Sequence, residues 1–501
     1  MSVSFSTIPA NIRVPMFYAE LDNSAAQGGS LLPRTLMIGQ WRSAVGTAVA
    51  NIPVMVRSDA EARTYFGEGS QLANMCIKAR LNDPFGELWA IPITDDAGGT
   101  AAAGLIKFAT NAATAGTWSV YIGGKRAQIA VTVGETPADQ ATALIAAINL
   151  VDDIEVVATA GGAGECVITS FHKGLLGNYI NTRLDYLGAM SGEVSPTGTT
   201  CTITQLVGGL VAPALTTAIA NMGDVPFDFI GIGNSDATAL TAIKAELNDT
   251  AGRWSPLRQV YGHAFTTSDA AVGSLSTLGN AQNSQHLTYF GTYLCPNTPW
   301  EITGAGVAQV AKSGKVDPAR PMQTLPLEGI LPPAEANRMT ATERNTLLYD
   351  GVSPFYVSGG YMRFDRVVTT YQTNSSGVAD ASYLDIETML TLQYILRDTK
   401  SRITGKYGRH KLANDGTRFG AGQAIVTPSV IRGELVSAYR DYEALGLVED
   451  TTSFVANLVV ERNSTDPNRI DVLYPPDLVN QLRIFALLAQ FRLQYPAATV
   501  V

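Results

Sequence analysis

Few residues of this 501-residue chain have a spacing that could support chemistry. The clearest candidate is GIGNSD at residues 231–236, which follows an apolar run and precedes a helical pattern, as a dinucleotide-binding loop would. Asp236 replaces the third glycine of that motif, and its carboxylate would repel a pyrophosphate. No acidic partner about 20 residues further on follows a second strand. The sequence therefore favours a capped strand-to-helix turn, with Asn234 or Ser235 as the cap.

The histidines and serines also have simpler structural explanations. The four histidines lack the spacing of metal ligands, and no G-x-S-x-G elbow or S-x-x-K pair occurs. We expect His263 and His286 to be hydrogen-bonded core residues on strands. The remaining two histidines are His172 and His410. A catalytic triad scattered along the chain stays open at this point.

Acidic residues and cysteines likewise predict no reaction. Asp380, Asp385 and Glu387 crowd the start of a predicted helix, where the helix dipole stabilises carboxylates. The four cysteines lie far apart without a CxxC pair and are expected to be free thiols in a reducing compartment: Cys76, Cys166, Cys201 and Cys295. We predict no catalytic residue, no metal site and no cofactor.

Composition favours a subunit of an assembly. Charged residues make up 16% of the chain, below the roughly 25% of ordinary soluble domains, while the apolar share is 46%. The net charge of −9 argues against a nucleic-acid partner. There is no run of about 18 apolar residues, so no direct membrane insertion is expected, and no signal peptide is evident. We expect synthesis and assembly in the cytoplasm.

Alternating strand and helix patterns predict an α/β layer with parallel strands and right-handed crossovers. The expected strands lie at 32–41, 86–93, 227–233, 258–267 and 286–294. Two helices are expected between the first two strands, the second beginning near Ser70.

Residues 105–205 follow a different pattern, which predicts a small α+β unit inserted into the larger domain. A hairpin turns at Gly123–Gly124, and a helix begins with Thr136 as cap and Pro137 as its first residue. One face of the hairpin is expected to carry Trp118, Val120, Ile122, Ile129, Val131 and Val133.

The C-terminal part predicts two helices after a proline-rich connector at 316–337. The longest helix of the chain is expected within 380–408, and a second at 428–446. The second has an apolar stripe of Val430, Leu435, Ala438, Tyr442 and Leu445. Its charged face is either solvated surface or a docking face for a partner: Arg432, Glu434, Arg440, Asp441 and Glu443.

Both ends of the chain are more apolar than solvated termini usually are. Pro9 and Pro15 favour an extended conformation near the N-terminus, and residues 469–495 resemble strands. We predict that residues 3–24 and 478–495 are intersubunit strands that pair with β-structure of adjacent copies. The candidate contact residues are Ile8, Ile12, Val14, Phe17, Tyr18, Leu482, Ile484, Phe485, Leu487, Phe491 and Leu493.

Several long phrases, taken in order, resemble the tail sheath proteins of Mu-like contractile bacteriophages. They are IPANIRVPMFYAELDNSAA, FGEGSQLANM, VVTTYQTNSSGVADASYLDIETMLTLQYI, YGRHKLANDGTRFGAGQAIVTP and DPNRIDVLYPPDLVNQLRIFALLAQFRL. The resemblance covers nearly the whole chain. The inserted unit is its least diagnostic part.

The resemblance implies a non-enzymatic subunit of the virion, assembled in the host cytoplasm. Many copies would stack as rings or helical strands, with six-fold symmetry, around a tail tube protein. Baseplate and tail terminator proteins would be further partners. A metastable extended sheath would shorten and drive the tube through the host envelope. The charged face of the 428–446 helix is then the candidate tube-facing surface.

The predicted fold is α/β and α+β: a discontinuous sheath core with a βα-repeat sheet layer, an inserted domain and extended arms. The expected parts are an N-terminal arm (1–26), a split middle domain (27–104 and 206–335), an inserted, outward-facing domain (105–205), a C-terminal core domain (336–477) and a C-terminal arm (478–501). The alternatives are an α/β hydrolase or nucleotide-dependent enzyme, or another self-assembling phage protein such as a tube or capsid protein.

Overall fold

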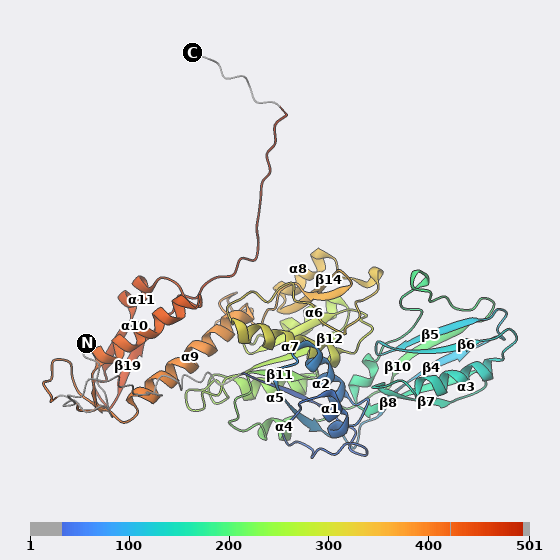
Figure 1. The fold of residues 1–501 in the computed structure, drawn as a ribbon, viewed down its shortest axis with the longest axis horizontal. Helices are drawn as coiled ribbons and strands as arrows, with labels where there is room; N and C mark the ends of the chain where they lie inside the picture. The colour runs from blue at the N-terminus through green and yellow to red at the C-terminus, as the bar shows by residue number, and fades with distance from the viewer. Residues whose placement is uncertain (1–32, 421, 494–501) are drawn as a thin grey trace, which may run out of the picture. The chain divides into compact units, whose positions relative to one another are not determined.

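The computed structural model describes residues 33–420 and 422–493, and these residues contain the expected α/β layer (Figure 1). The predicted arm at residues 1–26 lies outside them. Within the described residues, eight strands form one sheet. Their spatial order is β15 (Tyr361–Phe364), β14 (Val352–Ser358), β13 (Leu287–Thr292), β12 (His263–Asp269), β11 (Phe229–Ile232), β1 (Arg34–Gln40), β3 (Glu87–Ile93) and β2 (Val54–Met55).

Strand β1 lies inside the sheet and pairs in parallel on both sides. Leu36 lies opposite Trp89 of β3 and opposite Ile230 of β11. The strands from β11 to β14 continue in parallel, whereas β2 and β15 are antiparallel edges. Parallel strands are buried on both faces, which explains why the middle of β1, residues 36–39, is an unbroken apolar run. The predicted parallel β/α layer is confirmed.

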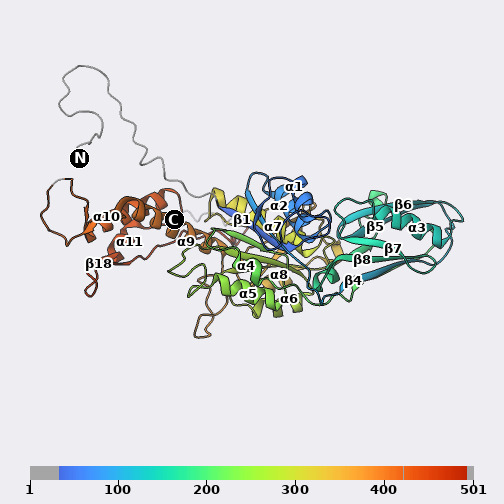
Figure 2. The same cartoon turned by 90° about the horizontal axis from the view of Figure 1, so that it is seen from below.

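Helices cover both faces of this sheet (Figure 2). One face carries α1 (Asp59–Phe66), α2 (Gln71–Asn82) and α7 (Pro299–Val316), and the other carries α4 (Thr216–Ala220), α5 (Ala237–Leu247) and α6 (Val272–Asn280). A Cβ atom at Gly304 would lie 2.3 Å from the backbone oxygen of Met75. Glycine at this position therefore lets α2 and α7 pack backbone to backbone.

The helix starts agree with the sequence prediction in α2 but not in α5. Ser70 caps α2, since its side chain accepts a hydrogen bond from the backbone N–H of Ala73. The cap of α5 is Asp236, which accepts from the backbone N–H groups of Thr238 and Ala239. The prediction of Asn234 or Ser235 was wrong, because a carboxylate suits two N–H groups at the positive end of the helix dipole.

The segment between β3 and β11 forms the predicted α+β unit. In its described residues, one sheet has the order β10 (Cys201–Val207), β4 (Ala101–Phe108), β8 (Glu165–Lys173) and β7 (Val156–Ala160), and another has the order β6 (Lys125–Val131), β5 (Gly116–Ile122) and β9 (Thr182–Leu184). Helix α3 (Pro137–Ile148) packs on them, and two short 3₁₀ turns follow, η1 (Leu175–Tyr179) and η2 (Ala189–Ser191).

The predicted hairpin and capped helix of this unit are confirmed. Trp118 is buried and its indole N–H donates to Gln140 Oε1 at 3.0 Å, so the hairpin and α3 share one core. The expectation for Val133 was wrong: β6 ends at Val131, and Val133 is exposed.

A buried ion cluster joins this unit to the sheet layer. Lys125 follows the Gly123–Gly124 turn, and its Nζ lies 2.8 Å from Glu301 Oε1 of α7 and 3.6 Å from Glu155 Oε1. Asn74 of α2 and Trp300 of α7 both donate to Glu155 Oε1, at 2.7 and 2.8 Å. Burial is the main cause that raises the pKa of Glu155 to about 7, and the Glu301 carboxylate adds to it.

Strands β14 and β15 extend the eight-stranded sheet after a connector that contains η3 (Glu335–Asn337) and α8 (Ala341–Tyr349). β14 pairs in parallel with β13, with Tyr289 opposite Val352. The predicted boundary at 335/336 therefore falls between strands of one sheet. The domain boundaries remain predictions.

The C-terminal region is built around α9 (Ile386–Tyr407), the longest helix among the described residues, as predicted. Its first turns contribute Ile386 and Leu390 to the core of the sheet layer, whereas Ile395 belongs to a separate C-terminal core. That core is formed with α10 (Pro428–Ala444), α11 (Thr451–Asn457), and two two-stranded sheets, β16 (Lys411–Leu412) with β17 (Ile425–Val426) and β18 (Val459–Arg462) with β19 (Ile470–Leu473).

One sequence expectation for this region was wrong. The apolar stripe of α10 is shifted: Val430 and Leu445 are exposed, and Ile431 and Tyr439 are buried in their place. Tyr439 stacks on Phe454 of α11 with ring centroids 3.7 Å apart, which turns this side of α10 inward. Residues 474–493 carry no strand of their own subunit longer than an isolated bridge at Leu478, and the predicted pairing of residues 478–495 with adjacent copies stays a prediction.

Across the described residues, every helix is too short or too polar to span a bilayer.

We predict that Glu155 makes stability depend on pH. Its pKa is about 7 in the folded chain and near 4.5 when unfolded, so the folded state holds the extra proton between these values. Stability should therefore fall as the pH rises from about 5 to 7. Thermal unfolding should show a smaller decrease for Glu155→Gln, whose amide oxygen still accepts from Asn74 and Trp300. Equal pH profiles for variant and wild type would contradict this role.

Candidate assembly site in the C-terminal region

The GIGNSD motif at residues 231–236, which first suggested chemistry, is explained by helix capping and packing within the fold. Asp236 caps α5, so its carboxylate already occupies the helix N-terminus where a phosphate would bind. A Cβ atom at Gly233 would lie 2.4 Å from Gln71 Nε2, which accounts for that glycine by packing. Among the described residues, no three His, Cys, Asp or Glu side chains are grouped as a metal site.

His263 and His286 are hydrogen-bonded inside the sheet layer, as the sequence predicted. His263 lies in β12 with its Nε2 2.9 Å from Thr288 Oγ1, and burial lowers its pKa well below 6.5. His286 directly precedes β13 and has its Nε2 2.8 Å from Asp249 Oδ1. The cysteines are free thiols, also as predicted.

The acidic residues at the start of α9 form an ion cluster that the helix dipole alone does not explain. Asp385 Oδ1 and Oδ2 each accept a 2.7 Å hydrogen bond from Arg366. Arg483, far along the chain, lies 3.1 Å from Asp385 and 2.8 Å from Glu387. We call these four residues the Arg483 cluster. Burial raises the pKa of Glu387, and the positive charge of Arg483 opposes this shift.

The chain that follows β19 contacts its own subunit at residues 478–483, whereas the described residues after Arg483 form no helix or strand. Before it, the backbone N–H of Val479 donates to Leu447 O, Leu478 forms a bridge with Val448, and Gln481 Nε2 donates to Ala319 O. After it, residues 484–493 have no helix or strand, and Figure 1 traces them as an extended chain. The C-terminal residues that were predicted to contact an adjacent copy are all 72–97% exposed. They are Leu482, Ile484, Phe485, Leu487, Phe491 and Leu493.

The hairpin of β18 and β19 offers free backbone groups in the same region. In the described residues it is a sheet of two strands, so each strand has one unpaired edge. Val460 and Ile470 pack on the C-terminal core, while Val459, Val472 and Leu473 are exposed. An edge of this kind is a template for another strand.

Four of the five residues proposed to face a tube are bonded within their own chain. Arg432 donates to the carbonyl oxygens of Val455 and Leu458. The others pair with a neighbouring helix or turn: Glu434 with Lys406 at 2.6 Å, Asp441 with Arg402 at 2.6 Å and Glu443 with Thr451 at 2.7 Å. Arg440 is exposed. These contacts give most of the charged face a structural role beside any docking role.

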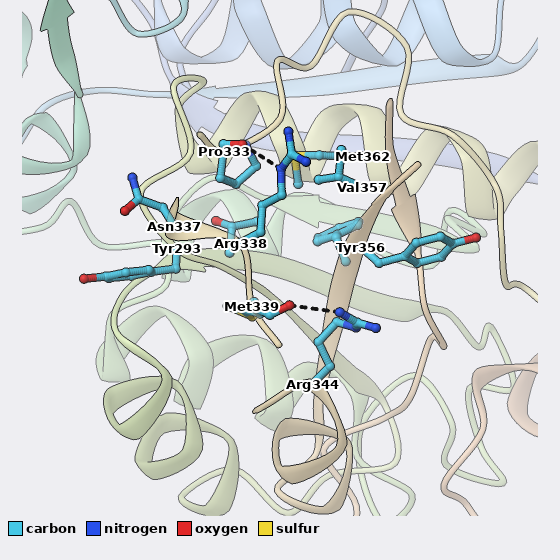
Figure 3. Close-up of a pocket in the computed structure, with 12 residues that line it drawn as sticks. Tyr293, Pro333, Asn337, Arg338, Met339, Arg344, Tyr356, Val357 and Met362 are labelled. Carbon is cyan, nitrogen blue, oxygen red and sulfur yellow. Dashed lines mark hydrogen bonds between the residues drawn. The ribbon is translucent and has the colours of Figure 1, made fainter. Parts of the chain in front are cut away.

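A pocket of about 260 Å³ lies between the connector and the end of the large sheet (Figure 3). Its two arginines are engaged: Arg344 pairs with Asp365 at 2.7 Å and donates to Met339 O, and Arg338 donates to Pro333 O. We interpret them as contacts that hold the connector in place rather than as ligands for an anion.

Sequence reasoning missed Arg483 as a partner of α9, because nothing local relates residues almost a hundred positions apart. It also missed α8, although a signal was present: Thr340 and Glu343 form a capping box, the T-x-x-E pattern of a helix start.

Comparisons with known proteins agree with the resemblance found in the sequence. A model of the phage tail sheath protein central domain matches residues 208–370, and a model of the phage tail sheath C-terminal domain matches residues 378–492. The Mu-like prophage FluMu tail sheath protein of Haemophilus influenzae is 40% identical over 494 residues, which cover 98% of this chain and 100% of the relative. The chain belongs to the family of phage tail sheath proteins and is of the Mu-like kind.

Solved sheath tail proteins are similar at a lower level. Those of Desulfitobacterium hafniense and Listeria innocua are each 12% identical, with TM-scores of 0.47 and 0.48. The matches cover 93% and 91% of this chain and 100% and 95% of the solved chains.

We predict that Arg432 and Arg440 differ in their effect on stability. Arg432→Ala removes charged donors from two backbone carbonyls and should lower the stability of the C-terminal region by about 1.5–3 kcal/mol. Arg440→Ala, the matched control on the same helix, should stay within about 0.5 kcal/mol of wild type. Thermal unfolding of both variants checks this. A neutral effect of Arg432→Ala would show that its two hydrogen bonds do not stabilise the fold.

Proposed function

We propose that this chain is the repeating subunit of a contractile sheath that polymerises around a tail tube by exchanging its C-terminal segment with a neighbouring copy. The observation that carries the proposal is the exposure of large apolar side chains along residues 484–493. Membership of the phage tail sheath family supplies the context. The exchanged part begins later than the 478 expected from sequence, because residues 478–483 contact their own subunit.

The free energies of apolar burial, chain ordering and hydrogen bonding indicate which interactions the exchanged segment needs in order to bind a neighbouring copy. Burying each large apolar side chain contributes about 1.5–3 kcal/mol. Ordering each residue of an extended segment costs about 1–2 kcal/mol, so apolar burial alone roughly cancels this cost. Backbone pairing adds about 1 kcal/mol per hydrogen bond. We therefore propose that the segment adds as a strand to an exposed edge, such as that of β18 and β19, rather than packing by its side chains alone.

Contraction would then be a change of packing between subunits and not a chemical reaction. The two arrangements would share the exchanged segments and differ in the contacts between subunit bodies. We propose a tail tube protein inside the sheath, and baseplate and tail terminator proteins at its ends, with assembly in the host cytoplasm. The N-terminal residues Ile8, Ile12, Val14, Phe17 and Tyr18 remain candidates for a second exchanged strand. The tube-facing surface is assigned to α10, with Arg440 as its exposed cation.

We predict that a chain ending at Arg483 folds but does not polymerise. Thermal unfolding should match wild type, because the large apolar side chains of residues 484–493 are 75–97% exposed, and negative-stain microscopy should show dispersed particles. A chain that lacks only residues 494–501 is the matched control and should form sheath tubes. Removal of residues 1–24 tests the N-terminal arm in the same way. Normal tubes from the chain ending at Arg483 would refute the exchange.

We predict that Arg440→Glu weakens assembly on the tube and leaves tube-free polymerisation intact. A reversed charge at an exposed position changes association more than stability. Co-sedimentation of sheath with purified tubes, at low and at physiological salt, measures the effect. Lys400→Glu, on the exposed part of α9, is the matched control. Unchanged co-sedimentation of Arg440→Glu would remove α10 as the tube-facing helix.

A further inference from the structure

A buried ion pair holds the chain at residue 483 on its own subunit, in addition to the contacts of Leu478, Val479 and Gln481. Arg483 has an 11% exposed side chain, and the Glu387 side chain it pairs with is fully buried. Arg483 also lies within 3.4 Å of Gln323 Oε1, in the connector after α7. Leu482 and Ile484, on either side of Arg483, are 72% and 82% exposed, and every described residue after Arg483 is exposed, so Arg483 is the last described residue whose side chain its own subunit buries.

Release of Arg483 would be costly because of Glu387. The second carboxylate oxygen accepts from the backbone N–H of Met322 at 2.5 Å, so Glu387 is fixed in place inside the protein. Arg366 is occupied by both oxygens of Asp385. Among the described residues, only Arg483 places a positively charged group within ion-pair distance of the Glu387 carboxylate. If it left, a buried carboxylate would lose its partner, which is far less favourable than breaking an exposed pair.

The Arg483 cluster lies at the N-terminal end of α9, the helix that also packs on the sheet layer. Asp385 is the N-cap residue of α9 and Glu387 lies in its first turn. The same helix contributes Ile386 and Leu390 to the core of the sheet layer, and its Arg397 pairs with Asp228 at 2.6 Å. A force on the C-terminal segment would therefore reach the sheet layer through α9, and would bypass the hairpin of β18 and β19.

We propose that the Arg483 cluster is the fixed root of the exchanged segment: it holds residue 483 on its own subunit while a second copy of this chain takes residues 484–493. The inference rests on the proposed function, since it concerns the same segment. It adds that Arg483 is a positioning residue, which sets where the chain leaves the subunit and carries tension into α9 when the sheath changes length.

The test compares Arg483→Met with the double variant Glu387→Gln plus Arg483→Met. The double variant removes both charges, and its amide oxygen still accepts from Met322, so folding is preserved where the single variant leaves a buried charge unpaired. Lys400→Met is the matched control, because it removes one exposed positive charge from α9. Thermal unfolding of the double variant and of the control should both match wild type.

Two readouts separate a root from an ordinary structural contact. Hydrogen exchange at the Val479 amide should be at least ten-fold faster in the double variant than in the control. Sheath tubes should form, because residues 484–493 are unchanged, but their median length after brief sonication should be at least three-fold shorter. Arg483→Lys should restore most of the length.

The root requires both readouts to change, so a double variant that matches the control in either one overturns it. If the chain ending at Arg483 polymerises normally, the exchange itself is wrong, and the root has no function. If that chain fails to polymerise while the double variant matches the control in Val479 exchange and in tube length, the exchange stands and the root is overturned. Short tubes together with fast exchange support the root.

Discussion

An apolar segment that its own subunit does not cover is the constraint on which the rest of this structure depends. Residues 484–493 carry large apolar side chains at 75–97% exposure, together with backbone groups that no strand of the described residues pairs. Water is a poor environment for the side chains, and an extended backbone needs hydrogen-bond partners. A chain of this family has identical copies beside it, and under the proposed exchange a hairpin edge that is unpaired among the described residues would supply the backbone partners.

The body of the subunit shows the opposite arrangement, because its parts are joined by buried ionic contacts. Lys125 with Glu155 and Glu301 joins the inserted unit to α2 and α7, and Asp228 with Arg397 joins the sheet to α9. Removing one partner from such a contact leaves a buried charge, which resists any sliding of one part against another. A rigid body whose terminal segment is exchanged with a neighbour, as proposed, suits a sheath that changes length by repacking between subunits. Packed interfaces have discrete arrangements, so such a sheath can switch from one arrangement to another.

Sequence patterns predicted the elements whose signals are local. The parallel sheet, the hairpin at Gly123–Gly124, the cap at Ser70 and the long helix α9 all follow from periodicity and turn chemistry within short windows. The errors have physical reasons too: the apolar stripe on α10 is shifted because Tyr439 stacks on Phe454, and Asp236 caps α5 because a carboxylate suits two N–H groups at a helix N-terminus. The Arg483 cluster could not be predicted, since it joins positions 366, 385, 387 and 483 through the fold alone.

The most direct measurement is a cryo-electron microscopy map of the assembled sheath that resolves residues 478–493. The account predicts that residues 484–493 leave their own subunit immediately after Arg483 and run as a strand beside β-structure of an adjacent copy. Arg483 itself should remain paired with Glu387 of the same chain. A map in which these residues fold back onto their own subunit, with no strand shared between copies, would contradict the account.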